Sequence, residues 1–305
     1  TRHMRADEAV RIKYDSKFAQ SANYWKNSIG MNKCIDSIGL IAQKQHYEDI
    51  IRHWQDSTGY LKGQLDFDKM ARLYNERFEP RKAAMYFQET FLRTNELTTR
   101  AMKAVTGTTK KDKKGDYVTF ADNSNTWDAS LDKDVQAVLL KNYREHVDAK
   151  YLPAFYQIID KKFGGDYQKY VNYLWEASAL MKKDAKVYVT KNAIKKDAGL
   201  QYGTQLKAMR EVFNRALDAT RDSIDNQEQM LCAAKLRMEE DLPHYSDANF
   251  TMRLSYGQVG GFDLGGRPSG YYTTAESIVE KMKRGDNGLF DYKAEPVMQQ
   301  LMSET

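Results

Sequence analysis

Apolar residues recur at helical spacing through most of the chain. The first stripe returns every three or four positions and consists of Val10, Tyr14, Phe18, Ala22, Trp25 and Ile29. This spacing predicts an amphipathic helix. The helix should begin near Asp7-Glu8, because acidic side chains suit a helix N-terminus. The pattern continues to about Trp54, with a bend at Gly30 or Gly39.

The same periodicity predicts further helical stretches. They cover residues 66–105, 130–163, 167–181 and 203–242, with a last short helix at 296–302. Pro80 and Pro153 should bend or interrupt the first two stretches, because proline lacks the backbone N–H that a helix interior needs. Strand-like patterning is scarce before residue 247, so most of the chain should be helical.

A polar segment, residues 107–128, separates two of these stretches. It is rich in Lys, Asp, Asn, Gly and Thr, which predicts a long loop. Its densest basic run is Lys110, Lys111, Lys113 and Lys114. We interpret this run as a solvated, mobile loop rather than a phosphate-binding patch, because charged side chains are exposed by default.

The pattern changes near the C-terminal end of the chain. Between Asn249 and Val259 apolar and polar residues alternate, which predicts a half-buried β-strand. A glycine-rich loop and a helix-capping box at residues 273–276 follow it. A strand cannot satisfy its backbone alone, and no earlier segment offers an obvious partner. We therefore expect the rest of the sheet to lie in sequence outside this chain.

These patterns predict a mainly α fold in two parts. Residues 1–246 should form a bundle of long helices. Residues 247–305 should add one or two short β segments, the glycine-rich loop and short helices. The chain begins Thr1-Arg2-His3-Met4 and reads as internal sequence, so we expect it to be a piece of a longer protein.

Charge and cysteine content narrow the possible partners. Lys and Arg number 47 against 42 Asp and Glu, a net charge of +5 that is too mild to predict a nucleic-acid partner. No apolar run is long enough to cross a membrane, so no membrane partner is expected. Cys34 and Cys232 lie among apolar residues of predicted helices. We interpret them as small buried thiols, with a single disulfide as the alternative.

The sequence lacks the motifs of common enzymes. GxSxG, GxxxxGK[ST], HExxH and paired CxxC patterns do not occur, and no cofactor or metal is predicted. His46, Asp49 and His53 could share a helix face, as some zinc ligands do, but solvated surface positions are the simpler interpretation. Carboxylates such as Glu239 and Glu240 also read as surface charge. The chain therefore carries no complete active site of its own.

One strip of the first helix departs from this background. Gln20, Asn23, Asn27 and Gly30 follow each other at helical spacing, with Lys26 beside them. Exposed helix faces are usually charged, and Asn is a poor helix former, so a line of neutral amides suggests directed hydrogen bonds. On physical grounds alone, helix–helix packing through buried amides is the simpler interpretation, and ligand binding is the alternative.

Several runs of the sequence resemble bacterial serine dipeptidyl-peptidases of types 7 and 11. Residues 10–32 and 247–257 carry the most specific similarity, and residues 165–170 and 271–274 also fit. The resemblance implies a chymotrypsin-like double β-barrel, interrupted by a large helical domain that roofs the active-site cleft. This chain resembles the helical domain and the first strand that returns to the barrel. The implied parent enzyme removes dipeptides from peptide N-termini, is periplasmic or secreted, and could be a homodimer.

The resemblance also says what the chain lacks. The family's catalytic His and Asp precede the matching segment, and its nucleophilic Ser, in a Gly-Asn-Ser-Gly type of motif, follows it. The chain should therefore be inactive alone, with the catalytic β-barrel of the same polypeptide as its partner. In this family an Asn of the helical domain binds the α-amino group of the peptide substrate. By resemblance that residue is Asn23 or Asn27, supported by Trp25, Lys26 and Gly30.

A function of a different class stays open at this point. The second helical stretch is dense in aromatic residues, among them Tyr74, Phe78 and Phe87. An all-helical scaffold or adaptor could bind a partner protein through them, although such residues more often form a core. Further barrel strands in the same gene would favour the peptidase, and further helices would favour the scaffold.

Overall fold

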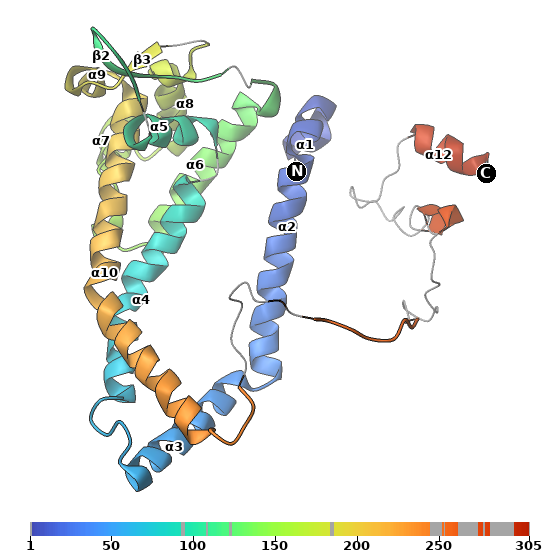
Figure 1. The fold of residues 1–305 in the computed structure, drawn as a ribbon. Helices are drawn as coiled ribbons and strands as arrows, with labels where there is room; N and C mark the ends of the chain where they lie inside the picture. Colours follow the sequence, from blue (N-terminus) through green and yellow to red (C-terminus); the bar gives the residue numbers. More distant parts are fainter. Residues whose placement is uncertain are drawn as a thin grey trace. The chain divides into compact units, whose positions relative to one another are not determined.

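The chain forms two compact units, Thr1–His244 and Tyr245–Thr305 (Figure 1). In the computed structural model the described residues are 2–92, 95–107, 109–121, 124–183, 186–244, 252, 254–261, 274–276, 278–280 and 296–304. The first unit is mostly helical, with a small β-sheet. In the described residues, no helix is both long enough and apolar enough to cross a membrane.

The predicted first helix is present as two separate helices, and a further short helix precedes them. α1 (Arg2–Ala6) is followed by α2 (Glu8–Ser37), and the Asp7 carboxylate caps α2 by accepting from the backbone N–H groups of Ala9 and Val10. The break falls at Gly39, whose φ of 62° is the left-handed conformation that glycine tolerates, and not at Gly30, which lies inside α2. α3 (Leu40–Thr58) then runs to Gly59.

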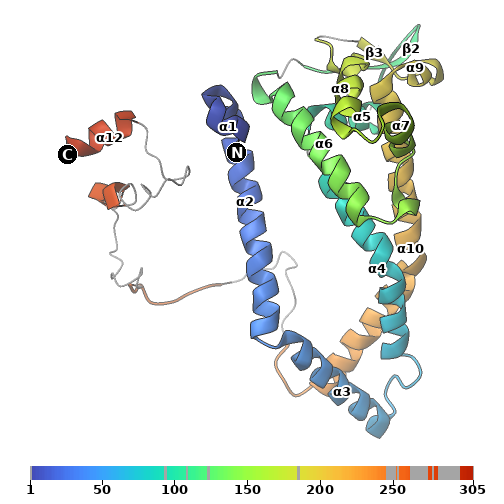
Figure 2. The ribbon, with the colours of Figure 1, turned by 180° about the vertical axis from the view of Figure 1, so that it is seen from behind.

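The other helices follow the predicted order with changed ends. They are α4 (Phe67–Phe91), α5 (Glu96–Thr106), α6 (Ala129–His146), α7 (Phe155–Phe163), α8 (Tyr167–Glu176), α9 (Lys191–Lys196) and α10 (Ala198–Met238). Short 3₁₀ turns lie at η1 (Ser124–Thr126), η2 (Ala149–Tyr151) and η3 (Ala179–Met181). Pro80 lies inside α4 and does not end it, whereas Asn95 caps a new helix, α5, within the stretch predicted as one. α4 and α10 run side by side between the two ends of the unit (Figures 1 and 2).

The prediction of a long loop at 107–128 is wrong. β1 (Lys110–Asp112) and β2 (Gly115–Thr119) form a hairpin, and β3 (Lys186–Tyr188) pairs with β2 to complete an antiparallel sheet in the order β1-β2-β3. The strands are too short to show a clear alternation of apolar and polar residues, and β3 lies far along the sequence from β2. Neither the strands nor their pairing was therefore evident from the sequence. The lysine run is held on a sheet whose inner face buries Val118 and Val187.

A large aromatic cluster forms the main core of the first unit. It contains residues of α4, α5, α6, α7 and α8 and of the first half of α10. Its rings include Phe91, Phe155 and Tyr202, whose centroids are 4.9–6.4 Å apart. Aromatic pairs at these separations stabilise a core beyond their buried area. α10 approaches α5 so closely that a Cβ on Gly203 would lie 2.7 Å from the Ala101 carbonyl oxygen, so only glycine fits there.

A second, much smaller cluster lies at the other end of the unit. Ile51, Leu65, Phe67 and Ala234 are its buried members, and they join α3, the start of α4 and the end of α10. Gln227 connects the same elements, because its side chain accepts from the Asp66 N–H and donates to the Gln64 carbonyl. We refer to these groups as the aromatic cluster and the small cluster.

In the second unit, α12 (Pro296–Ser303) agrees with the predicted tail helix. The predicted strand and capping box fall partly outside the described residues. Met252 and residues 254–261 are described, and they form no strand. The apolar side chains of this segment are almost fully exposed, for example Tyr256 at 92% and Val259 at 99%. These residues have no sheet partner among the described residues.

Candidate functional site

The N-terminal end of α2 is fastened to α6 through Tyr14. The Tyr14 hydroxyl donates to Oδ1 of Asp132 at 2.6 Å and accepts from the backbone N–H of Asp128 at 2.8 Å. The other carboxylate oxygen of Asp132 accepts from the Glu96 N–H at 2.9 Å. One carboxylate thus joins α2, α5 and α6. We call this group, Tyr14, Glu96, Asp128 and Asp132, the Tyr14 clamp.

Burial sets the electrostatics of the clamp. Asp132 is only 4% exposed, and burial raises the pKa of its carboxyl above the ordinary value, although the hydrogen bonds from Tyr14 and from the Glu96 N–H oppose the rise. Burial and the hydrogen bond to Asp132 raise the pKa of Tyr14, so its hydroxyl stays protonated and remains a donor. The clamp fixes the direction in which α2 leaves the aromatic cluster.

The middle of α2 carries the predicted amide strip, and the residues of this strip are exposed to solvent. Gln20, Asn23, Lys26, Asn27 and Gly30 are all exposed. Val10, near the start of the helix, is the buried residue of α2. In the described part of the chain neither asparagine has a hydrogen-bond partner for its side chain, and a Cβ on Gly30 would meet no atom within 4 Å. The structure contradicts packing of these amides between helices in this chain.

The predicted supporting residues lie differently around α2. Successive residues of a helix turn by about 100°, so Lys26 lies roughly 60° from Asn23, whereas Trp25 lies roughly 160° from both asparagines. Trp25 is 68% exposed on this opposite face. A ligand held by the amides could contact Lys26 and pass close to Gly30, but any support from Trp25 would be indirect.

Two flanking residues were missed by the sequence analysis. Tyr24 and Met31 lie three residues before and four residues after Asn27, which places them roughly 60° and 40° from it. They are 65% and 61% exposed. The spacing of Tyr24, Asn27 and Met31 on one side of the helix was the signal available in the sequence. The strip therefore has an apolar border on one side and an ammonium group on the other.

This arrangement can bind a polar group without a metal. Amide oxygens accept from an ammonium group, amide nitrogens donate to a carbonyl or carboxylate, and neither carries a full charge that must be neutralised. Among the described residues, no cluster of three or more His, Cys, Asp or Glu side chains could hold a metal ion. His46, Asp49 and His53 are exposed, as the surface interpretation predicted.

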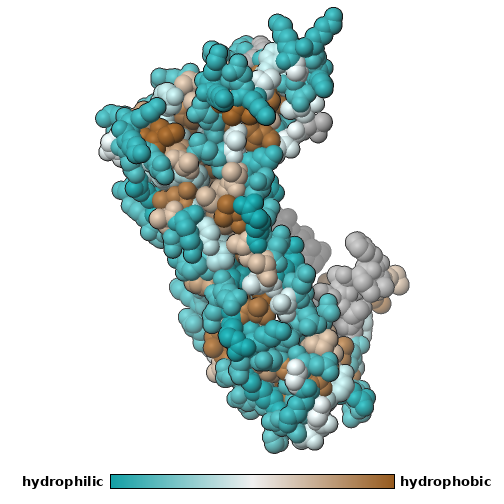
Figure 3. All heavy atoms as spheres, turned by 90° about the vertical axis from the view of Figure 1, so that its left-hand side faces the viewer, coloured by the Kyte–Doolittle hydropathy of each residue, from teal (hydrophilic) through white to brown (hydrophobic). Residues whose placement is uncertain are grey.

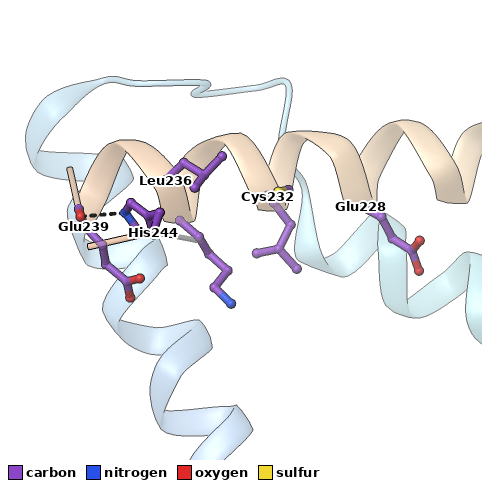
Figure 4. A pocket seen from close by; sticks show the side chains of 7 residues that line it. Glu228, Cys232, Leu236, Glu239 and His244 are labelled. Atoms are coloured by element: carbon purple, nitrogen blue, oxygen red, sulfur yellow. Dashed lines mark hydrogen bonds between the residues drawn. The ribbon is translucent and has the colours of Figure 1, made fainter. Parts of the chain in front are cut away.

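A hollow of about 290 Å³ lies along the C-terminal half of α10 (Figure 4). It is lined by Glu228, Leu231, Cys232, Lys235, Leu236, Glu239 and His244. Nε2 of His244 lies 2.8 Å from the Glu239 carbonyl oxygen, which can only accept, so this nitrogen carries a proton. Cys232 precedes Glu239 by two helical turns, roughly 10 Å along the axis. The thiol and the imidazole therefore do not form a nucleophile and base.

The prediction of buried cysteines is wrong. Cys34 and Cys232 are both exposed, free thiols, which also excludes the alternative disulfide. Apolar residues on the same helix faces, such as Met31 beside Cys34 and Leu236 beside Cys232, are themselves exposed, so they do not bury the thiols.

Family comparison agrees with the helical architecture. The model of the peptidase S46 family matches residues 1–304 of the chain. The chain is 32% identical over 291 residues to dipeptidyl-peptidase 7 of Porphyromonas gingivalis, covering 91% of this chain and 41% of the relative. It is 26% identical over 301 residues to the Asp/Glu-specific dipeptidyl-peptidase of the same organism, covering 92% of this chain and 41% of the relative. The chain thus spans about two fifths of the length of these relatives.

A solved structure shares the fold. The crystal structure of Porphyromonas endodontalis DPP11 in complex with the dipeptide Arg-Glu superposes with a TM-score of 0.69, covering 99% of this chain and 45% of that one at 18% sequence identity. The predicted mainly α fold and the resemblance to dipeptidyl-peptidases of types 7 and 11 are confirmed. At this identity the structural match concerns the fold alone.

Proposed function

The chain belongs to the peptidase S46 family, and we propose that it is the helical domain of a serine dipeptidyl-peptidase that removes dipeptides from peptide N-termini. In this proposal the domain covers the active-site cleft of a catalytic β-barrel in the same polypeptide. The chain alone is inactive, because the catalytic triad belongs to the barrel. In that enzyme the exposed residues 254–257 would pair with the barrel as a strand. The whole enzyme is periplasmic or secreted and is a candidate homodimer.

The observation that carries the proposal is the bare amide strip on a helix with a fixed direction. Asn23 and Asn27 point away from the packed core and lack partners among the described residues. An amide oxygen can accept from the substrate's α-ammonium group, which loses water on entering a cleft and needs an acceptor in exchange. The Tyr14 clamp would keep this acceptor at a constant height above the scissile bond.

A domain that covers the cleft in this way would explain why the enzyme cleaves after the second residue of the peptide. If the ammonium group is held by Asn23 or Asn27, the peptide bond presented to the nucleophile is the one at a fixed distance from it. Holding both reacting groups in one geometry removes much of the entropic barrier to acyl transfer. The nucleophile itself would act with a His base and an orienting Asp, as in other serine peptidases.

The test compares asparagines on opposite faces of α2. Asn23→Ala and Asn27→Ala are made in the full-length enzyme, and Asn32→Ala, exposed roughly 140° around the helix from Asn27, is the matched control. Losing a hydrogen bond to a charged group costs about 1.5–3 kcal/mol, so one strip variant should lose about 10- to 100-fold in kcat/KM on substrates with a free N-terminus.

Two measurements test whether a loss of activity comes from unfolding or from an effect unrelated to the substrate's ammonium group. Replacing an exposed helical Asn by Ala should change the free energy of unfolding by less than about 0.5 kcal/mol, so the loss of activity cannot come from unfolding. Substrates with an acetylated N-terminus lack the ammonium group, and the variants should not lose activity on them relative to the wild type. Unchanged kcat/KM in both strip variants, or an equal loss in Asn32→Ala, would reject the proposed role.

A further inference from the structure

The positive charge of this protein is concentrated in two short segments. Residues 110–119 and 182–197 contain ten lysines and four aspartates, with no arginine or glutamate. This excess of six positive charges compares with a net charge of +5 for the whole chain, so the remainder is close to neutral. A mild net charge therefore conceals a strongly basic region.

The fold brings the two segments together. β2 pairs with β3, with Tyr117 opposite Tyr188 and Thr119 opposite Lys186, and α9 follows directly after β3. β2, β3 and α9 lie at one end of the first unit and α3 lies at the other (Figure 1). All ten lysines are exposed: Lys110, Lys111, Lys113, Lys114, Lys182, Lys183, Lys186, Lys191, Lys195 and Lys196. Lys110 and Lys111 are successive residues of β1 and so point to opposite sides of the sheet, and the lysines together surround this end of the unit, which we call the lysine face.

Two of the described aspartates of these segments, Asp112 and Asp197, are hydrogen-bonded within the fold. Asp197 is turned inward, because its carboxylate accepts from the backbone N–H groups of Ala179 and Leu200. Asp112 accepts from Lys186 and from the Tyr188 hydroxyl, and the hydrogen bond from Lys186 lowers the pKa of that carboxyl. The charge of one lysine is thus compensated within the sheet, while most of the others face solvent.

The choice of side chains indicates the kind of partner. Arginine binds phosphate and bases through a planar fork, whereas lysine is a compact point charge without such directionality. Single-stranded nucleic acids also need free aromatic faces on which bases stack. Here Tyr117 and Tyr188 are only partly exposed, pack against each other at 5.8 Å, and Nζ of Lys186 lies 3.7 Å from the Tyr117 ring centroid. A second copy of this face would be repelled by like charge.

We propose that the lysine face docks the protein electrostatically on an anionic lipid surface. Charges spread over a hairpin, a turn and a short helix can approach many headgroups at once, and each lysine near such a surface adds to the attraction. The face that carries α9 and α10 is mainly hydrophilic, with only scattered apolar groups (Figure 3). Binding should therefore be peripheral and salt-sensitive. This revises the expectation of no membrane partner, which rested on apolar runs alone.

Vesicle co-sedimentation of the full chain tests the proposal. Vesicles of phosphatidylglycerol and phosphatidylcholine in equal parts should bind the chain at about 0.1 M salt and release it at about 0.5 M, where the screening length falls by about half. Vesicles of phosphatidylcholine alone should not bind it. The test variant changes Lys110, Lys111, Lys113 and Lys114 to Gln. It should lose at least about tenfold in affinity for the anionic vesicles.

The matched control removes the same charge elsewhere. Lys33, Lys44, Lys69 and Lys207 are exposed lysines outside the lysine face, and the control variant changes all four to Gln. It should bind almost as tightly as the unmodified chain. Failure to bind anionic vesicles, or an equal loss in both variants, would overturn the proposal. Tighter binding to single-stranded DNA or to polyglutamate than to the vesicles at equal charge concentration would overturn the lipid assignment.

Discussion

The aromatic cluster and the small cluster hold the two ends of one helical unit, but by unequal means. The aromatic cluster joins several helices through interlocking rings, and Phe155 and Tyr202 in it are almost fully buried. The small cluster has few fully buried side chains, led by Ile51 at 0% exposure. α2 begins near the first cluster and leads to α3 at the second. The candidate site therefore lies on a helix with one firmly held end and one lightly held end.

The largest effect should come from the centre of the aromatic cluster. Phe155 is 0% exposed, and its ring contacts those of Phe91, Tyr156, Tyr170 and Tyr202. Phe155→Ala should lower the free energy of unfolding by about 3–5 kcal/mol, because the cavity cannot fully collapse among such rings. Urea unfolding followed by circular dichroism measures the change. Phe78→Ala, at a ring 62% exposed, is the control and should cost less than about 0.5 kcal/mol.

An intermediate effect is expected at the small cluster. Ile51→Ala should cost about 2 kcal/mol, at the low end for such a substitution, because few side chains surround the site and they can relax. The loss should be local. Hydrogen exchange should become faster in α3 and in the last turns of α10, while amides of α5 to α8 keep their protection. Equal acceleration in both regions would show that the two clusters form one cooperative core.

The smallest of the three effects concerns the Tyr14 clamp. Tyr14→Phe removes the hydroxyl that donates to Asp132, and it should cost about 1–2 kcal/mol at pH 7. Faster hydrogen exchange should be confined to α1 and the first turns of α2. The control is Tyr24→Phe, which removes a hydroxyl from the exposed part of the same helix. An unchanged exchange rate in α2 would mean that the clamp does not hold the helix.

The cost of Tyr14→Phe should also depend on pH. The pKa of Asp132 is raised in the folded protein, so its contribution to stability is complete below the pKa of the unfolded chain and is lost as pH rises through the folded pKa. Losing the Tyr14 hydrogen bond raises that pKa further, because the bond favours the charged form. The difference in unfolding free energy between the two chains should therefore shrink from pH 7 to pH 4. A difference that grows on acidification would contradict this account.

Helices with strong local signals were predictable from the sequence. Asp7 caps α2 where the first helix was predicted to begin, and Asp166 caps α8, whose predicted start was residue 167. Such residues act on the backbone within a few positions, as does Gly59, which ends α3. The amide strip was also found, since its spacing on one helix needs no tertiary information. What the sequence could not predict was its exposure. Apolar periodicity predicts a face that seeks a partner, but it does not say whether the partner lies within the chain.

Features that depend on distant pairing were missed for the same reason. β2 is recognised as a strand only once β3, almost seventy residues later, lies beside it. The exposure of Cys34 follows from the lack of packing around the middle of α2. Trp25 was grouped with the strip through the family resemblance, although helix geometry places it on the other side. The basic character of the lysine face was averaged out in the net charge.

The 30 residues of α2 span roughly 45 Å. α3 and the paired α4 and α10 connect its C-terminal end back to α6, to which the Tyr14 clamp fastens its start, so these helices form a closed ring within the first unit (Figure 2). A closed ring of helices cannot change one angle without changing another. Its corner at Gly39 is open around the Cα atom, whereas the corner at Tyr14 is locked by a buried carboxylate. Asn23 and Asn27 can therefore move relative to the aromatic cluster only if the Tyr14 clamp opens while the chain bends at Gly39.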